Sequence, residues 1–126
     1  GQGKLLPSEA GERIDTLQRH ALGNGLIQDM VLWVIERYTP AEKQVPARLQ
    51  RYALKLQNAL AAIETDPDLR SSSRFDLGDI AIATALAYVD FRKLQPGWGS
   101  LYPQTADWFA TASSRRSMLA ARLQDG

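Results

Sequence analysis

The chain has 126 residues, of which 44% are apolar and 23% are charged, the composition of one globular domain. Its 15 basic and 14 acidic residues nearly balance, which argues against nucleic acid or an anionic membrane surface as a partner. It has no cysteine and one histidine, so disulfides, thiol nucleophiles and cysteine-based metal sites are excluded, and we expect no bound metal.

The first predicted helix begins after Pro7, with Ser8 as its N-cap, and ends at Tyr38, before Pro40. Steps of three and four residues place one set of positions on a common face of this helix: Ile14, Leu17, Ala21, Asn24, Gln28, Val31 and Ile35.

The second half of this helix is apolar around most of its circumference, because only two of its residues between positions 26 and 35 are polar. A single neighbouring layer cannot cover such a surface. Two interpretations remain open: a central helix surrounded by its own bundle, or a second face that meets another domain or subunit.

The same helix contains the sequence LGNG at positions 22–25, and each glycine in a helix interior costs about 1 kcal/mol relative to alanine. One interpretation is a kink or local break. The other is that Gly23 and Gly25 keep the surface low for a ligand or another backbone, with Asn24 offering its amide.

A second, amphipathic helix is predicted from Pro46 to Ile63, and its basic residues are interpreted as a solvated face. The stretch from Thr65 to Arg74 is rich in Pro, Asp and Ser, which predicts a surface loop.

The third helix is expected to open with two carboxylates followed by an uncharged run from Ile80 to Val89, which is typical of a bundle centre. With Asp76 as N-cap, Asp79 falls at the third helical position, so the pair forms an aspartate variant of the capping box. Phe75 and Ile80 then occupy the positions of a hydrophobic staple. We interpret both acids as architectural rather than as an acid–base pair, because nothing nearby in the sequence supplies a cleft or partner.

The rest of the chain completes the predicted all-α, five-helix bundle. Trp98 lies in a turn, QPGWG, and is expected to plug the edge of the core. A short helix is expected from Pro103, carrying Trp108 and Phe109, and a final one from about Ser117. His20 is interpreted as a surface residue, because no Ser, Cys or acid is placed in sequence to form a triad with it.

Three stretches resemble the C-terminal all-helical domain of cytosolic glutathione transferases: LLPSEAGERIDTLQRHALGNG, FDLGDIAIATALAYVDFR, and GW followed by YPQTADWFA. The similarity covers nearly the whole chain, and its most specific part is the capping box. Asp76 stands where that family usually has Ser or Thr, which is compatible with the same capping role.

The resemblance implies that residues 8–126 form this helical domain and that residues 1–7 are the remnant of an interdomain linker. It also implies an N-terminal thioredoxin-like domain that binds glutathione and carries the catalytic residue that activates its thiol. No such pattern occurs in this sequence, so we expect the chain to be the C-terminal part of a longer protein. The apolar surplus of the first helix would then face the chain's own N-terminal domain and a second subunit of a homodimer.

The resemblance further implies that the complete protein transfers glutathione, as cosubstrate, to a small, apolar electrophile, and that this domain alone is inactive. Asn24 matches a position near glutathione bound in the partner subunit. The implied substrate wall consists of Ile27, Met30, Val31, Val34 and Tyr38. The alternative is a non-enzymatic assembly module of the same fold. We expect a cytoplasmic protein, since the absence of cysteine fits a reducing compartment. We expect no membrane segment, because no apolar stretch approaches the roughly 18 residues needed for a span.

Overall fold

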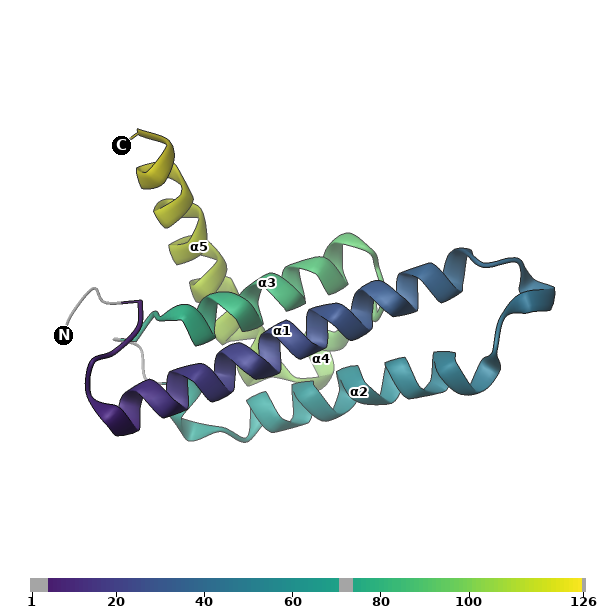
Figure 1. Cartoon of the computed structure of the whole chain (residues 1–126), viewed down its shortest axis with the longest axis horizontal. Coiled ribbons are helices and arrows are strands. Elements are labelled where there is room, and N and C mark those ends of the chain that lie inside the picture. Colours follow the sequence, from purple (N-terminus) through teal and green to yellow (C-terminus); the bar gives the residue numbers. More distant parts are fainter. Residues whose placement is uncertain (1–4, 71–73, 126) are drawn as a thin grey trace.

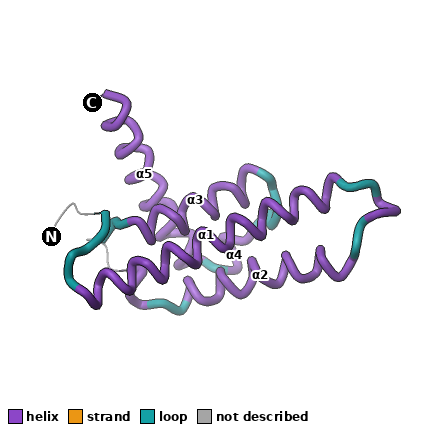
Figure 2. The backbone as a smooth tube through the Cα atoms, in the orientation of Figure 1, coloured by secondary structure: helices purple, strands orange, loops and turns teal. Residues whose placement is uncertain are grey.

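The computed structural model describes residues 5–70 and 74–125. Within these residues it is entirely helical, with no strand (Figure 2). The α-helices are α1 (Ala10–Tyr38), α2 (Pro46–Glu64), α3 (Leu77–Phe91), α4 (Trp98–Leu101) and α5 (Pro103–Asp125), and 3-10 turns occupy Ala41–Lys43 and Pro67–Arg70. The predicted all-α fold with five helices is therefore confirmed for the described part of the chain.

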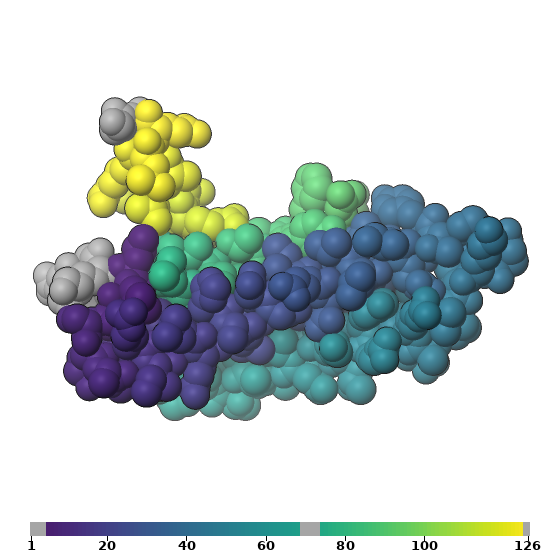
Figure 3. Space-filling model, in the orientation of Figure 1, coloured from purple at the N-terminus to yellow at the C-terminus, as the bar shows by residue number. Residues whose placement is uncertain are grey.

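Three long helices, α1, α2 and α3, lie lengthwise beside one another, and the C-terminal half of α5 projects away from them (Figures 1 and 3). They enclose one hydrophobic core, in which the α3 residues Ile82, Leu86 and Val89 have no exposed surface. This agrees with the expectation that the uncharged run of α3 belongs at the bundle centre. In the described part of the chain, no helix has both the length and the hydropathy of a membrane span.

The N-cap of α1 is Glu9, so the prediction of Ser8 was wrong by one residue. The Glu9 carboxylate accepts hydrogen bonds from the backbone N–H groups of Glu12 (2.7 Å) and Gly11 (3.0 Å), and these bonds lower its pKa. The longer side chain thus satisfies two N–H groups that have no partner inside the helix.

The α1 helix continues unbroken through positions 22–25, so the predicted kink or break is absent. Gly23 is buried, and a Cβ atom built there would lie 2.4 Å from the Ala81 carbonyl carbon of α3. Its missing side chain lets the backbones of α1 and α3 approach closely. At Gly25 a Cβ atom would meet nothing within 4 Å, so the bundle itself gives no reason for that glycine.

The C-terminal region corrects one prediction, because the two helices expected from Pro103 and Ser117 are one continuous helix, α5. No Gly or Pro follows Pro103 before the last residue, so nothing interrupts the helical backbone. The short α4 precedes it, and Trp98 is 5% exposed and donates from Nε1 to Asp90 (2.7 Å). Residues 71–73 of the predicted loop, and residues 1–4 of the predicted linker, lie outside the described residues.

Candidate functional site

One long face of α1 is left uncovered by the bundle, and α1 crosses the front of the molecule in Figure 3. We call this surface the open face of α1; its exposed members are Ile14, Leu17, Ala21, Asn24, Gln28, Val31, Ile35 and Tyr38. Several are large and apolar, and Ile14, Ile35 and Tyr38 are 56%, 57% and 75% exposed. Of the two interpretations of the apolar surplus, the described residues therefore favour a face that meets another domain or subunit.

Most of the face predicted by the three-and-four spacing thus points away from the core. The buried side of α1 is instead formed by Gly23, Leu26, Met30, Trp33 and Val34. Asn24 lies near the middle of the open face, with apolar residues toward both ends of the helix. Asn24 and Gln28 are thus two exposed amide side chains within a mainly apolar surface.

The residues predicted for the substrate wall separate into two groups. Val31 and Tyr38 are exposed, and Ile27 is partly buried against the core. Met30 has no exposed surface and Val34 is 8% exposed, because both belong to the core side of the helix. As a correction, Met30 and Val34 are core residues of the bundle, and of the five predicted positions only Ile27, Val31 and Tyr38 keep surface that is accessible from outside.

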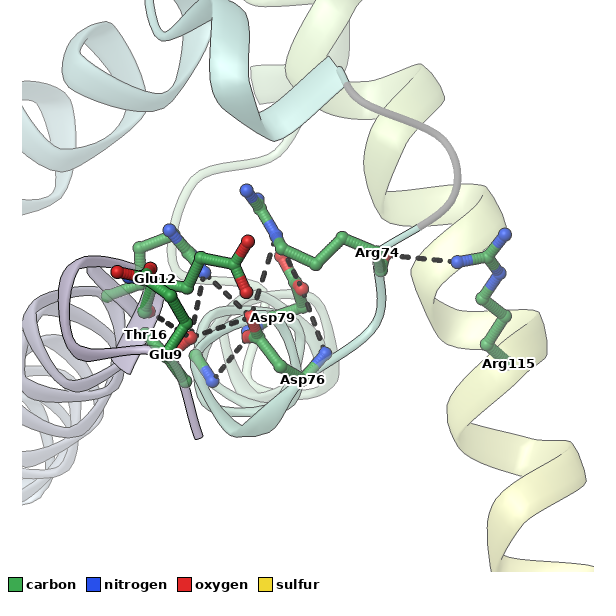
Figure 4. A network of polar contacts seen from close by, with 9 residues as sticks. Glu9, Glu12, Thr16, Arg74, Asp76, Asp79 and Arg115 are labelled. Atoms are coloured by element: carbon green, nitrogen blue, oxygen red, sulfur yellow. Dashed lines mark hydrogen bonds and ion pairs between the residues drawn. The ribbon is translucent and has the colours of Figure 1, made fainter. Parts of the chain in front are cut away.

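A cluster of polar side chains lies at the start of α3, where the two predicted carboxylates form a capping box (Figure 4). One oxygen of Asp76, Oδ1, accepts from the N–H groups of Gly78 (2.9 Å) and Asp79 (3.1 Å). In return, Asp79 Oδ2 accepts from the Asp76 N–H (3.0 Å). Phe75 and Ile80, the proposed staple residues, are both partly buried beside this box.

The same carboxylates connect α3 to other segments, which the sequence alone did not predict. Asp76 Oδ2 accepts from Thr16 Oγ1 (2.9 Å) and Arg19 Nη2 (2.7 Å), both on α1. Asp79 accepts from Arg74 Nε and Nη2, each at 3.2 Å. Local spacing cannot identify Thr16 and Arg19 as partners of Asp76, because they lie 60 and 57 residues away in the sequence, whereas Arg74 lies only five residues before Asp79.

Burial and hydrogen bonding act on the two carboxyl groups with different outcomes. Burial alone would raise the pKa of Asp76, but the Asp79 N–H, the Thr16 hydroxyl and the Arg19 charge together lower it below its ordinary value. For Asp79, burial raises the pKa despite the opposing Arg74. Because hydrogen bonds within the fold occupy these oxygens, we interpret the pair as structural rather than catalytic. Among the described residues, no cluster of three His, Asp or Glu side chains could hold a metal ion.

These pKa directions predict opposite pH dependences for two isosteric variants. The Asp76 carboxylate adds stability that is fully present above its ordinary pKa of 3.8 and is lost as the pH falls through its lowered value. The destabilisation by Asp76→Asn should therefore shrink in acid. Asp79 has a raised pKa, so the wild type loses stability as the pH rises from 3.8 through that value. The destabilisation by Asp79→Asn should therefore shrink as the pH rises.

Urea unfolding of both variants and the wild type between about pH 3 and pH 7 measures these differences. Parallel profiles for the two variants would contradict the assignment.

Comparison with known proteins identifies relatives of this helical domain. The family model described as "Glutathione S-transferase, C-terminal domain" matches residues 46–111. The chain is 31% identical over 97 residues to the uncharacterized GST-like protein YibF of Escherichia coli K12, a match covering 75% of this chain and 48% of YibF.

Two solved structures extend the similarity to three dimensions. A glutathione transferase family member from Pseudomonas fluorescens Pf-5, with bound S-(propanoic acid)-glutathione, is 34% identical with a TM-score of 0.82, covering 92% of this chain and 60% of that one. A glutathione S-transferase from Methylobacillus flagellatus KT, with glutathione bound, is 26% identical with a TM-score of 0.75, covering 84% and 54%. The chain thus spans about half the length of the curated relative it matches.

Proposed function

Because this chain belongs to the family of glutathione S-transferase C-terminal domains, we propose that it is the helical part of a complete glutathione transferase. The complete protein conjugates glutathione, as cosubstrate, to a small, apolar electrophile. The residue that activates the thiol lies in an upstream thioredoxin-like domain, so this chain alone is inactive. Residues 8–126 form the helical domain, and residues 1–7 belong to the linker. Two relatives with glutathione or a glutathione conjugate bound support this proposal.

The observation that carries the proposal is the open face of α1. A bundle with its own complete core still exposes Ile14, Leu17, Ile35 and Tyr38 along one side. We propose that the upstream domain and a second subunit of a homodimer cover this face. In that assembly Asn24 lies beside glutathione, while Ile27, Val31 and Tyr38 form one wall of the electrophile site. A cytoplasmic location fits this role, since glutathione keeps that compartment reduced.

Replacing Asn24 by Ala in the complete protein should raise the KM for glutathione several-fold, because an amide hydrogen-bonding partner is lost. The fold should be retained, since the Asn24 side chain is exposed. Steady-state kinetics with a reactive aryl halide and varied glutathione measure the KM. Gln18→Ala is the matched control. Gln18 is an exposed amide of the same helix, but it points about 120° away from Asn24 around the helix axis. An unchanged KM for the Asn24 variant would remove this residue from the site.

The alternative, a non-enzymatic assembly module, makes a different prediction for the same complete protein. Isothermal titration with glutathione should then show no binding, and the kinetic assay no conjugation above the uncatalysed rate. Glutathione binding by the complete protein, together with no activity of this chain alone, supports the transferase. Conjugation by this chain alone would contradict the proposal that the catalytic residue lies in the upstream domain.

A further inference from the structure

The segment that leads into α1 is attached to the start of α3. The backbone N–H of Leu77 donates a hydrogen bond to the Leu5 carbonyl, with an N···O distance of 2.8 Å. Leu77 is the first residue of α3, and an N–H at that position has no partner within its own helix. The carbonyl that satisfies it comes from a segment 72 residues earlier in the chain (77 − 5).

This bond completes the capping of α3. The N–H groups of Asp76, Gly78 and Asp79 are all satisfied by the two carboxylates of the capping box. Of the four N–H groups at the start of α3 that have no partner within the helix, only that of Leu77 is not bound by the capping box. A polar group at this partly buried position needs a partner, so the incoming chain has a defined place to bind.

Several segments meet at this attachment point. Asp76 joins α3 to α1 through Thr16 and Arg19. From α5, Arg115 Nη1 donates to the Arg74 carbonyl, at 3.0 Å (Figure 4). The Arg115 guanidinium also lies 5.9 Å from the centre of the Phe75 ring. The incoming chain therefore binds to a part of the fold that is fixed from two other helices.

We propose that the Leu5–Leu77 hydrogen bond is a positioning contact, through which the start of α3 sets where the upstream domain lies relative to the open face of α1. The attachment itself is a property of this chain, and its consequence for the upstream domain rests on the proposed transferase function. Leu5 and Leu77 form this bond through their backbone groups, so the bond itself does not require particular side chains at these positions.

Leu77→Pro removes the backbone N–H that the bond requires, and it also replaces the leucine side chain. Proline is favoured at the first position of a helix. The residue before it must be extended, and Asp76 already is, with φ −121° and ψ −174°. Leu77→Ala is the matched control, since it shortens the side chain and retains the N–H group. A chain that begins at Leu6 is a second variant, which removes the acceptor and leaves α3 unchanged.

Three measurements test the proposal. In this chain, NMR order parameters for the backbone N–H groups of Leu5, Leu6 and Ser8 should be about 0.85 in the wild type and Leu77→Ala, and below about 0.6 in Leu77→Pro. Hydrogen exchange at the Leu77 amide should be faster in the chain that begins at Leu6. In the complete protein, small-angle X-ray scattering should show a broader distribution of interdomain distances for Leu77→Pro alone, and the KM for glutathione should rise with kcat little changed.

An equally rigid segment in Leu77→Pro, or equal Leu77 exchange in the shortened chain, would overturn the attachment. A mobile segment combined with unchanged scattering would overturn the positioning role. If the complete wild-type protein fails to bind glutathione, the proposed function is wrong, yet order parameters and scattering still decide this inference. If Leu77→Pro does not fold, the chain that begins at Leu6 decides the attachment. In the scattering measurement, five additional Gly/Ser residues inserted before Leu5 of the complete protein are then compared with the same insertion after Leu5. Only the insertion before Leu5 should broaden the distribution, because the other leaves the upstream domain joined to the Leu5 carbonyl, and equal broadening would overturn the positioning role.

Discussion

Replacing Gly23 by Ala is expected to lower the free energy of unfolding by about 3 kcal/mol, because the new methyl group overpacks the α1–α3 contact. The added Cβ would lie 2.4 Å from the Ala81 carbonyl carbon and 2.5 Å from the Ile82 nitrogen. These are backbone atoms of a helix, so no side chain can rotate away, and the two helices must separate. Urea unfolding of the chain, followed by far-UV circular dichroism, measures the change.

The matched control for that variant lies two residues further along the same helix. Gly25→Ala meets no atom within 4 Å, so the only expected effect is the gain in helix propensity, about 0.5 to 1 kcal/mol of added stability. Equal stabilities for the two alanine variants would show that α1 and α3 do not depend on close backbone approach at Gly23.

The second large effect is expected for Asp76→Ala, which should destabilise the domain by about 3 kcal/mol or more. Removing this carboxylate deprives α3 of its N-cap and leaves the Arg19 guanidinium, whose side chain is 12% exposed, without its closest anionic partner. The same side chain holds Thr16, so the α1–α3 contact loses two hydrogen bonds at once. Thermal and urea unfolding should agree on the loss.

An exposed ion pair in the same bundle supplies the control. Lys55 pairs with Asp29 at 3.2 Å, and the Lys55 side chain is 48% exposed. Asp29→Ala should therefore cost less than about 1 kcal/mol, because exposed pairs are screened by solvent. A loss for Asp76→Ala no larger than the loss for Asp29→Ala would show that the capping network contributes little to folding.

Features that depend on neighbours in the sequence could be predicted. The capping box joins residues three positions apart, so the spacing of Asp76 and Asp79 is enough to indicate it. Its partners on α1 lie 60 and 57 residues away in the sequence, and no local rule pairs a particular arginine with a particular aspartate across that distance. The sequence therefore predicted the helix start but could not predict its connection to α1.

The orientation of α1 shows a different limit. Because the second half of this helix is apolar around most of its circumference, hydrophobic periodicity cannot decide which side of it faces the core. Met30 and Val34 lie on the core side, whereas Ile14 and Ile35, apolar in the same way, lie outside. The signal that could have oriented the helix is Gly23, since a buried glycine in a helix interior marks close approach by a neighbouring backbone.

The projecting end of α5 illustrates a third case. The sequence from Pro103 onward contains two apolar clusters separated by Ser113, Ser114 and two arginines, a pattern that favours two short helices. Serine weakens a helix only slightly, and no residue in this stretch breaks one, so the backbone continues as a single helix. The amino-acid composition therefore predicted a helix boundary before Ser117 that is absent from the structure.

The central claim is that the open face of α1 is covered in the complete protein, and hydroxyl-radical footprinting tests it most directly. Oxidation of Leu17 and Ile35 is measured by mass spectrometry in this chain and in the complete protein, with the exposed Leu101 of α4 as internal reference. Strong protection of Leu17 and Ile35 in the complete protein, relative to Leu101, is the predicted result. Equal oxidation of these two residues in both proteins would contradict the account.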